Sequence, residues 1–189
     1  TGAEATETTI KLARIFGRKT NPKKIGIISF VGSMQGKTLG ALMVGGKTKE
    51  KHWIVNLDPD MHHLPFPKSD SGGKFFHESM EKLEESGVDL KTIAAFMIEP
   101  FQGWGALFFP KEYIQELRKW ADKNNAIVIF DEVQAGFGRK VIEIAVLTGG
   151  SGYTMGGNST ATSGNVNIGN WQNGSDRAKS TITLMEILA

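Results

Sequence analysis

The sequence predicts an α/β fold built on a mostly parallel β-sheet, and three observations indicate it. Several runs of apolar residues show no alternation with polar residues, as expected of strands that are buried on both faces of a parallel sheet. Segments with the spacing of amphipathic helices stand between these runs, which is typical of β–α–β units. Acidic residues or glycines follow the runs directly, where open α/β sheets bind their ligands.

The helices are predicted from apolar residues at helical spacing and from their end signals. Thr1 and Glu4 fit a capping box at the start of the first helix, and Gly17 fits its end. Pro110 opens the last helix in a position that proline prefers. The predicted helices span residues 3–16, 75–86 and 110–123, and a shorter helix-like run spans 39–44.

The strands are predicted from the apolar runs. The clearest run has five apolar residues directly before Asp131, so this carboxylate is expected at the carboxyl edge of the sheet. An alternative role for Asp131 is to cap the following element. Residues 58–73 contain three prolines and are expected to form an irregular connection. The predicted strands span residues 25–31, 53–57, 93–98 and 126–131.

Composition excludes several classes of function. A net charge of +2 and the lack of a basic patch with interleaved aromatic residues argue against nucleic-acid binding. The chain has no cysteine, which excludes disulfides and thiolate sites, and its four histidines lack the spacing of metal ligands. No membrane-length apolar stretch or signal peptide is visible, so we expect a cytoplasmic protein with no membrane partner.

The chain divides into two segments by composition. Residues 1–139 carry the α/β pattern, and residues 140–189 form a divergent tail rich in Gly, Asn, Ser and Thr. No charged residue occurs between Glu143 and Asp176. Within the tail, residues 141–147 fit a strand, and residues 182–188 fit a strand or a short helix. Because the sequence opens inside a helix signal without a methionine, we expect a piece of a longer protein.

One alternative function is nucleotide hydrolysis. Gly32, Gly36, Lys37 and Thr38 follow a buried strand as in a P-loop, and Asp131 stands where such proteins hold a magnesium water. A P-loop has four residues between its glycines, however, whereas this loop has three. The missing residue would misplace several amide donors, which disfavours this alternative.

Four motifs in one order resemble the class III, or omega, aminotransferases that depend on pyridoxal 5'-phosphate (PLP). The motifs are TGAEATE at residues 1–7, GKTLG at 36–40, IEPFQG at 98–103 and FDEVQAGFGR at 130–139. The resemblance covers residues 1–139 and implies part of the large domain of a fold-type I transferase, a three-layer αβα structure. It also implies a homodimer that transfers an amino group from an ω-amine or amino acid to a 2-oxo acid.

The resemblance implies a set of cofactor contacts. Gly2 and Ala3 match the turn that binds the cofactor phosphate at a helix N-terminus. Asp131 matches the acid that pairs with the pyridine nitrogen and keeps it protonated. Val133 matches the residue that packs on the ring, and Gln134 matches the side chain that faces the phenolic oxygen.

Other positions match the family less closely. Met34 stands where an aromatic ring usually stacks on the cofactor, and Lys37 replaces an arginine that in some members holds a substrate carboxylate. Glu99 matches a glutamate that lines the substrate pocket, although it can also be a strand-end cap stiffened by Pro100. Because of these departures, the resemblance does not carry the choice of substrate over to this chain.

The resemblance leaves the catalytic residue unassigned. Family members place their Schiff-base lysine roughly thirty residues after the aspartate, which here falls near Thr160. No lysine occurs between Lys140 and Lys179, and Lys179 lacks the expected context. The sequence therefore predicts an aminotransferase fragment that is inactive as it stands; the non-enzyme alternative is a folded fragment without any activity.

Overall fold

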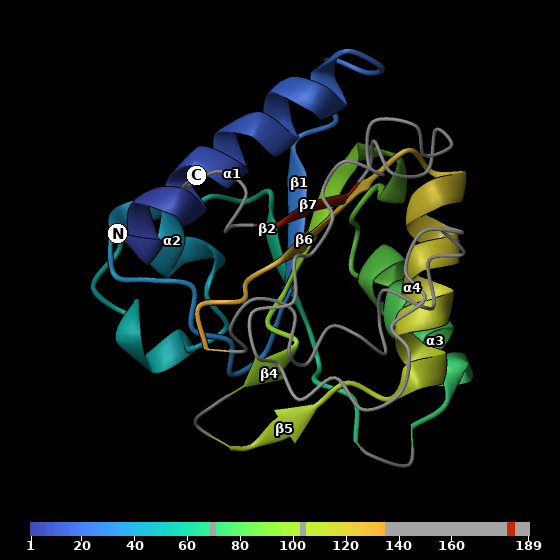
Figure 1. Ribbon diagram of the computed structural model, residues 1–189. Helices are drawn as coiled ribbons and strands as arrows, with labels where there is room; N and C mark the ends of the chain where they lie inside the picture. The colour runs from blue at the N-terminus through green and yellow to red at the C-terminus, as the bar shows by residue number, and fades with distance from the viewer. Residues whose placement is uncertain (69–70, 103–104, 135–180, 184–189) are drawn as a thin grey trace, which may run out of the picture.

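A five-stranded sheet forms the centre of the fold (Figure 1). The computed structural model describes residues 1–68, 71–102, 105–134 and 181–183. The strands of this sheet are β1 (Gly26–Phe30), β2 (Met61–Leu64), β3 (Ile93–Ile98), β6 (Ile127–Phe130) and β7 (Thr181–Thr183). They lie in the order β2-β1-β3-β6-β7, and every neighbouring pair is parallel.

Helices cover both faces of the sheet, which confirms the predicted three-layer α/β architecture (Figure 1). Helices α1 (Gly2–Arg18) and α2 (Leu39–Val44) lie on one face, and α3 (Gly73–Glu85) and α4 (Lys111–Lys123) lie on the other. The remaining elements are short: the 3-10 turns η1 (Thr48–Glu50) and η2 (Leu90–Thr92), and the antiparallel pair β4 (Phe101–Gln102) and β5 (Leu107–Phe108).

The structure confirms the predicted helices and three of the four predicted strands within a few residues. Thr1 and Glu4 form the expected capping box: the Glu4 amide donates to the Thr1 hydroxyl, and the Glu4 carboxylate accepts from the Thr1 amino group. Of the segments assigned to the tail, residues 141–147 lie outside the described residues. Residues 181–183 add β7 beside β6, and the division at residue 139 stays a prediction.

The predicted strand at 53–57 is wrong, because these residues form turns and the edge strand is β2 instead. Most of their apolar residues face outward: Trp53, Val55 and Leu57 are exposed, and Ile54 alone among the apolar residues of this segment is buried. The strand β2 contains His63, whose Nε2 lies 3.0 Å from the Lys51 Nζ and 3.0 Å from the Gly45 carbonyl oxygen. Lys51 Nζ also donates to that carbonyl, at 2.7 Å. These polar contacts fix β2 without an apolar run, so the hydrophobic pattern did not indicate it.

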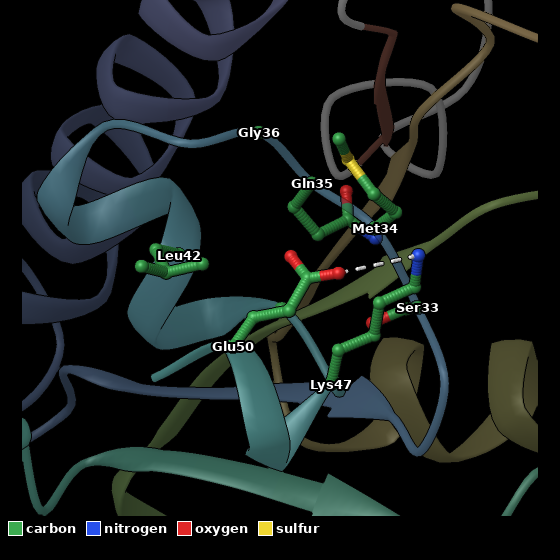
Figure 2. A pocket seen from close by; sticks show the side chains of 8 residues that line it. Ser33, Met34, Gln35, Gly36, Leu42, Lys47 and Glu50 are labelled. Carbon is green, nitrogen blue, oxygen red and sulfur yellow. Dashed lines mark ion pairs between the residues drawn. The ribbon is translucent and has the colours of Figure 1, made fainter. Parts of the chain in front are cut away.

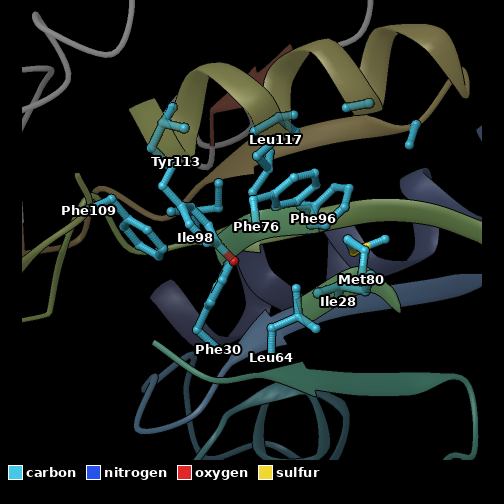
Figure 3. Packing of buried hydrophobic residues seen from close by; sticks show 14 of the residues in the cluster. Ile28, Phe30, Leu64, Phe76, Met80, Phe96, Ile98, Phe109, Tyr113 and Leu117 are labelled. Atoms are coloured by element: carbon cyan, nitrogen blue, oxygen red, sulfur yellow. The ribbon is translucent and has the colours of Figure 1, made fainter. Parts of the chain in front are cut away.

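The two faces of the sheet are packed differently. Under α3 and α4, large side chains interlock (Figure 3), with the rings of Phe30 and Phe109 4.7 Å apart and those of Phe76 and Tyr113 5.5 Å apart. Under α1 and α2, the core has no buried aromatic ring among its described members and combines the alanines Ala5, Ala13 and Ala95 with aliphatic side chains and Met97. The strands therefore bury both faces, as their unbroken apolar runs predict. Among the described residues, no helix is long and apolar enough to cross a membrane.

Candidate active site

The carboxyl ends of β1, β3 and β6 form one edge of the sheet. The strand order reverses there, because β2 flanks β1 on one side and β3 flanks it on the other. Loops leaving such a point diverge, and open α/β folds bind ligands in the resulting crevice. Ile98 and Phe130 are paired in register, and the Asp131 amide donates to the Ile98 carbonyl at 2.8 Å. The next residues, Glu99 and Asp131, are therefore neighbours at this edge.

Glu99 joins the end of β3 to the loop after β1. Its Oε2 accepts a hydrogen bond from the Met34 amide at 3.0 Å, across 65 residues of sequence. The residue is only 4% exposed. Burial raises the pKa of the Glu99 carboxyl to about 7; the Met34 amide opposes this shift, Asp131 adds to it and Lys47 opposes it. Glu99 can therefore hold or release a proton near neutral pH.

Asp131 is a buried carboxylate. Among the described residues, no cationic neighbour offsets the effect of burial on its pKa. It is 6% exposed, and its Oδ1 accepts from the Val133 amide at 3.1 Å. Burial raises the pKa of the Asp131 carboxyl to about 6, and the Val133 amide opposes the shift. A buried acid of this kind is suited to a cationic ligand group, which would stabilise its ionised form.

The N-terminus of α1 lies against the residues that follow Asp131. A Cβ atom placed on Gly2 would meet the Val133 Cγ2 at 3.2 Å. On its other side, α1 touches the loop after β1: Gly36 has a φ of +130°, and a Cβ there would lie 2.8 Å from the Ala3 Cβ. Three segments that are far apart in sequence thus meet here, and the cofactor contacts expected of them stay predictions.

The loop at residues 32–38 does not have the hydrogen bonding of a P-loop. The Gly32 amide donates to the Gly46 carbonyl at 3.1 Å, and the Ser33 amide donates to the Phe30 carbonyl at 2.9 Å. The Met34 amide is used by Glu99. Three successive amides are thus bonded to protein acceptors instead of turned toward an anion, so the nucleotide-hydrolysis alternative is not favoured.

A small pocket lies beside this site (Figure 2). Its volume is about 10 Å³, room for about one water molecule and far too little for a cofactor. Lys47 and Glu50 form an ion pair of 3.8 Å across it. Residues of the loop after β1 and of the α2 region line it: Ser33, Met34, Gln35, Gly36, Leu42, Gly45, Lys47 and Glu50. At this volume the pocket is a packing gap, with Met34 among its lining residues.

Some of the remaining predicted site residues lie near Asp131, and others are exposed. Met34, Gly2, Ala3 and Val133 belong to the segments that meet around Asp131. Lys37 is exposed on its loop, and Gln134 is exposed in the turn after β6. The predicted roles of these two side chains stay predictions. Among the described residues no group of three or more His, Cys, Asp or Glu side chains could hold a metal ion.

Sequence reasoning missed Glu7, on the second turn of α1. Its Oε1 accepts from the Thr38 hydroxyl at 2.6 Å, from the Gly40 amide at 2.8 Å and from the Ala41 amide at 3.1 Å. The partners lie more than thirty residues away, so no local pattern could indicate them. Gln35 and Gln102 were also missed: both are buried, and their side-chain amides have no hydrogen-bond partner among the described residues.

Comparisons with known proteins point to one family. The family model of the class-III aminotransferases matches residues 1–141. The chain is 35% identical over 142 residues to a 2-aminoadipate transaminase of Pseudomonas putida, covering 73% of this chain and 33% of the relative. It is 39% identical over 140 residues to the mitochondrial acetylornithine aminotransferase of Candida glabrata, covering 73% of this chain and 30% of the relative.

Solved structures show the same likeness. An amine transaminase from an uncultivated Pseudomonas species, in its PLP-bound form, matches with a TM-score of 0.63 and 28% identity. The match covers 74% of this chain and 34% of that one. The chain spans about a third of the length of the curated relatives it matches. With a family model matching three quarters of its length, the chain belongs to the class-III aminotransferase family.

Proposed function

We propose that this chain forms the cofactor-contact part of the large domain of a fold-type I, PLP-dependent aminotransferase. The observation that carries the proposal is the buried pair Glu99 and Asp131 at the carboxyl edge of the sheet, beside the N-terminus of α1. The proposed reaction class is transfer of an amino group from an ω-amine or amino acid to a 2-oxo acid. The transaminase names of the relatives support this class.

The residues present fit PLP. Gly2 and Ala3 are the first residues of α1, whose opening amides have no acceptor within the helix and are therefore suited to bind a phosphate group. Asp131 lacks a cationic partner among the described residues, and a protonated ring nitrogen would supply one. Met34 and Val133 come from separate segments and offer apolar groups to the two faces of the ring.

Each residue then has a role in the proposed chemistry. PLP, when bound, supplies an electron sink for the substrate carbanion. Asp131 would hold a proton on the ring nitrogen, and Gln134 would donate a hydrogen bond to the phenolic oxygen. Glu99 lines the substrate pocket and can exchange a proton near neutral pH. Lys37 attracts a substrate carboxylate as a point charge, without the bidentate geometry of an arginine.

We propose that the chain as it stands binds PLP reversibly and does not turn over substrate. The support is the lack of any lysine between Lys140 and Lys179, where the family places its covalent nucleophile. That stretch lies outside the described residues. Assembly as a homodimer and a cytoplasmic location belong to the same proposal.

Titration with PLP tests the site. We expect Asp131→Asn to raise the dissociation constant about tenfold or more, because a charge-assisted hydrogen bond is lost. Asp89→Asn is the matched control: Asp89 caps the turn η2 before β3, at the other end of that strand, and asparagine caps equally well. Equal affinities of the wild-type chain and Asp131→Asn would contradict the proposed site.

Borohydride reduction followed by mass spectrometry tests the proposed inactivity. We expect only scattered labelling of surface lysines and no turnover of an amine. A stable label on one lysine together with turnover would contradict the proposal, and Lys140 or Lys179 would then be the nucleophile to examine.

A further inference from the structure

We infer that Glu7 is a positioning residue of the proposed cofactor site: it fixes the loop that carries Met34 to the helix that carries Gly2 and Ala3. The inference rests on the proposed function and adds a residue that touches neither cofactor nor substrate. The proposed role of Glu7 is to set the distance between the Met34 loop and the N-terminus of α1.

A single carboxylate oxygen of Glu7 holds the N-terminus of α2. It accepts from the hydroxyl of Thr38 and from the amides of Gly40 and Ala41, at 2.6 to 3.1 Å. Thr38, the residue before α2, makes no side-chain cap within its own helix. A helix of six residues is too short to persist alone. Glu7 therefore fixes the N-terminal end of α2, while Ser29 and Lys51 bond to carbonyls at its C-terminal end.

Two further contacts join the same two elements. The Thr6 hydroxyl donates to the Gln35 carbonyl at 2.8 Å. Gly36 lies against Ala3 so closely that a Cβ would have no room. The first two turns of α1 thus hold the loop at several points, while Glu99 holds it through the Met34 amide. Met34 is thus held by its own amide and lies next to Gln35, which Thr6 holds.

The chemistry of PLP makes this fixed spacing important. Its phosphate and its ring would contact different elements, α1 and the segments around Asp131. Binding both ends at once strengthens affinity only if the two halves of the site are already at the right separation. Loosening Glu7 should therefore weaken a ligand that spans both halves and leave ligands of one half unchanged.

Three variants separate the effect of the Glu7 hydrogen bonds from the effect of its negative charge. Glu7→Ala removes all three hydrogen bonds, and Glu7→Gln keeps an acceptor oxygen. Gly40→Ala keeps the charge, but its Cβ would lie 2.3 Å from the Glu7 Oε2 and would displace that flexible side-chain end. Glu81→Gln, an exposed residue on α3 at the opposite face, is the control for loss of one acidic charge.

The experiment measures binding of three probes to the full chain: pyridoxine 5'-phosphate, pyridoxine and inorganic phosphate. None has an aldehyde, so none reacts with lysines. For Glu7→Ala and Gly40→Ala we expect the dissociation constant of pyridoxine 5'-phosphate to rise about tenfold, with the other two constants unchanged within about twofold. Glu7→Gln should lie between wild type and Glu7→Ala, and Glu81→Gln should match wild type.

The contrary outcomes are distinct. A wild-type chain that binds none of the probes would overturn both the proposed function and this inference. If wild type binds pyridoxine 5'-phosphate and Gly40→Ala and Glu7→Ala bind it equally well, the inference alone fails. Equal weakening of all three probes would show a merely structural role and would also overturn it. If Glu7→Ala does not fold, Gly40→Ala and Glu7→Gln decide the matter.

Discussion

The two faces of the sheet are built from different interactions. Under α3 and α4, aromatic rings interlock, and Phe76 and Phe96 are fully buried. Under α1 and α2, alanines bring the backbones close, and buried hydroxyl groups bond to carbonyls: Thr9 donates to Ala5 at 2.8 Å, and Ser29 donates to Val44. The first face is stabilised by the burial of large aromatic groups. The second face buries smaller apolar groups and adds directional bonds to backbone carbonyls, of which the Ser29 bond joins two elements.

This difference separates stability from geometry. Apolar packing can adjust to a change of side-chain shape at a cost in free energy. A hydrogen bond or a close backbone contact, in contrast, is lost when its partners move apart by a short distance. The site depends on such directional bonds: Glu7 and Thr6 of α1, and Glu99 after β3, anchor its loop. Changes on the aromatic face, which is the side of the sheet under α3 and α4, should therefore mainly affect the free energy of unfolding. Changes on the face under α1 and α2 should mainly affect ligand binding.

The largest expected effect is in the aromatic face. Phe76→Ala should lower the free energy of unfolding by about 3–5 kcal/mol, because it leaves a cavity among rings. Urea denaturation measures this cost, and Leu12→Ala, on the outer side of α1, should stay within about 0.5 kcal/mol of wild type. In the folded fraction, PLP affinity should not change. A cost for Phe76→Ala below about 1 kcal/mol would contradict the comparison.

A smaller effect on stability, but a larger one on binding, is expected from Gly36→Ala. The variant suffers both the strain of a φ of +130° and a clash with Ala3 and Ala41, for a cost of about 2–4 kcal/mol. Gly87→Ala is the matched control, because Gly87 has a φ of +98° and open space around it, so only the strain of about 1 kcal/mol remains. If both variants lose the same stability and bind PLP equally, close approach at Gly36 is unimportant.

The pH dependence of the free energy of unfolding shows whether the buried carboxyls of the site bind protons. Because burial raises the pKa of Glu99 from 4.5 to about 7, its contribution to stability is complete below pH 4.5 and is lost as pH rises through 7. Glutamine resembles the protonated acid at every pH. Glu99→Gln should therefore match wild type near pH 4 and exceed it by about 1–2 kcal/mol near pH 8.

Comparing urea denaturation of the two chains across this range removes the contribution of groups that do not interact with Glu99; Asp131 does interact with it, so the difference reports Glu99 together with its coupling to Asp131. Burial lowers the pKa of His62 and of His63, so both histidines act in the opposite direction, but they are common to both chains. A difference between the chains that does not vary with pH would contradict the assignment of a buried, proton-binding Glu99.

The smallest expected effect is a gain in stability from Tyr113→Phe. The Tyr113 hydroxyl is buried in the aromatic face and has no hydrogen-bond partner among the described residues. Removing it should raise the free energy of unfolding by about 1 kcal/mol, since no bond is lost with the buried polar group. A loss of stability in thermal or urea unfolding would show that the hydroxyl has a partner, such as a buried water.

The sequence predicted those parts of the fold that depend on local pattern. The run at β3 and the capping box at Thr1 needed only neighbouring residues, and Asp131 and Glu99 were placed by the strands they follow. The edge strand β2 was misplaced, because Lys51 and backbone carbonyls fix it through His63. Glu7 was missed for a related reason: its three donors are set by the tertiary fold.

The Met34–Glu99 hydrogen bond has a consequence for the order of folding. Its partners are separated by 65 residues, and β1 pairs with β3 across a similar distance. Contacts of such long sequence separation form slowly, because closing the intervening chain costs entropy before any contact repays it. The short link from Glu7 to Gly40 spans half that length and can form earlier. A pulse-labelling hydrogen-exchange experiment should therefore find the Gly40 amide protected before the Met34 amide, so that the site is among the last regions of the chain to become native.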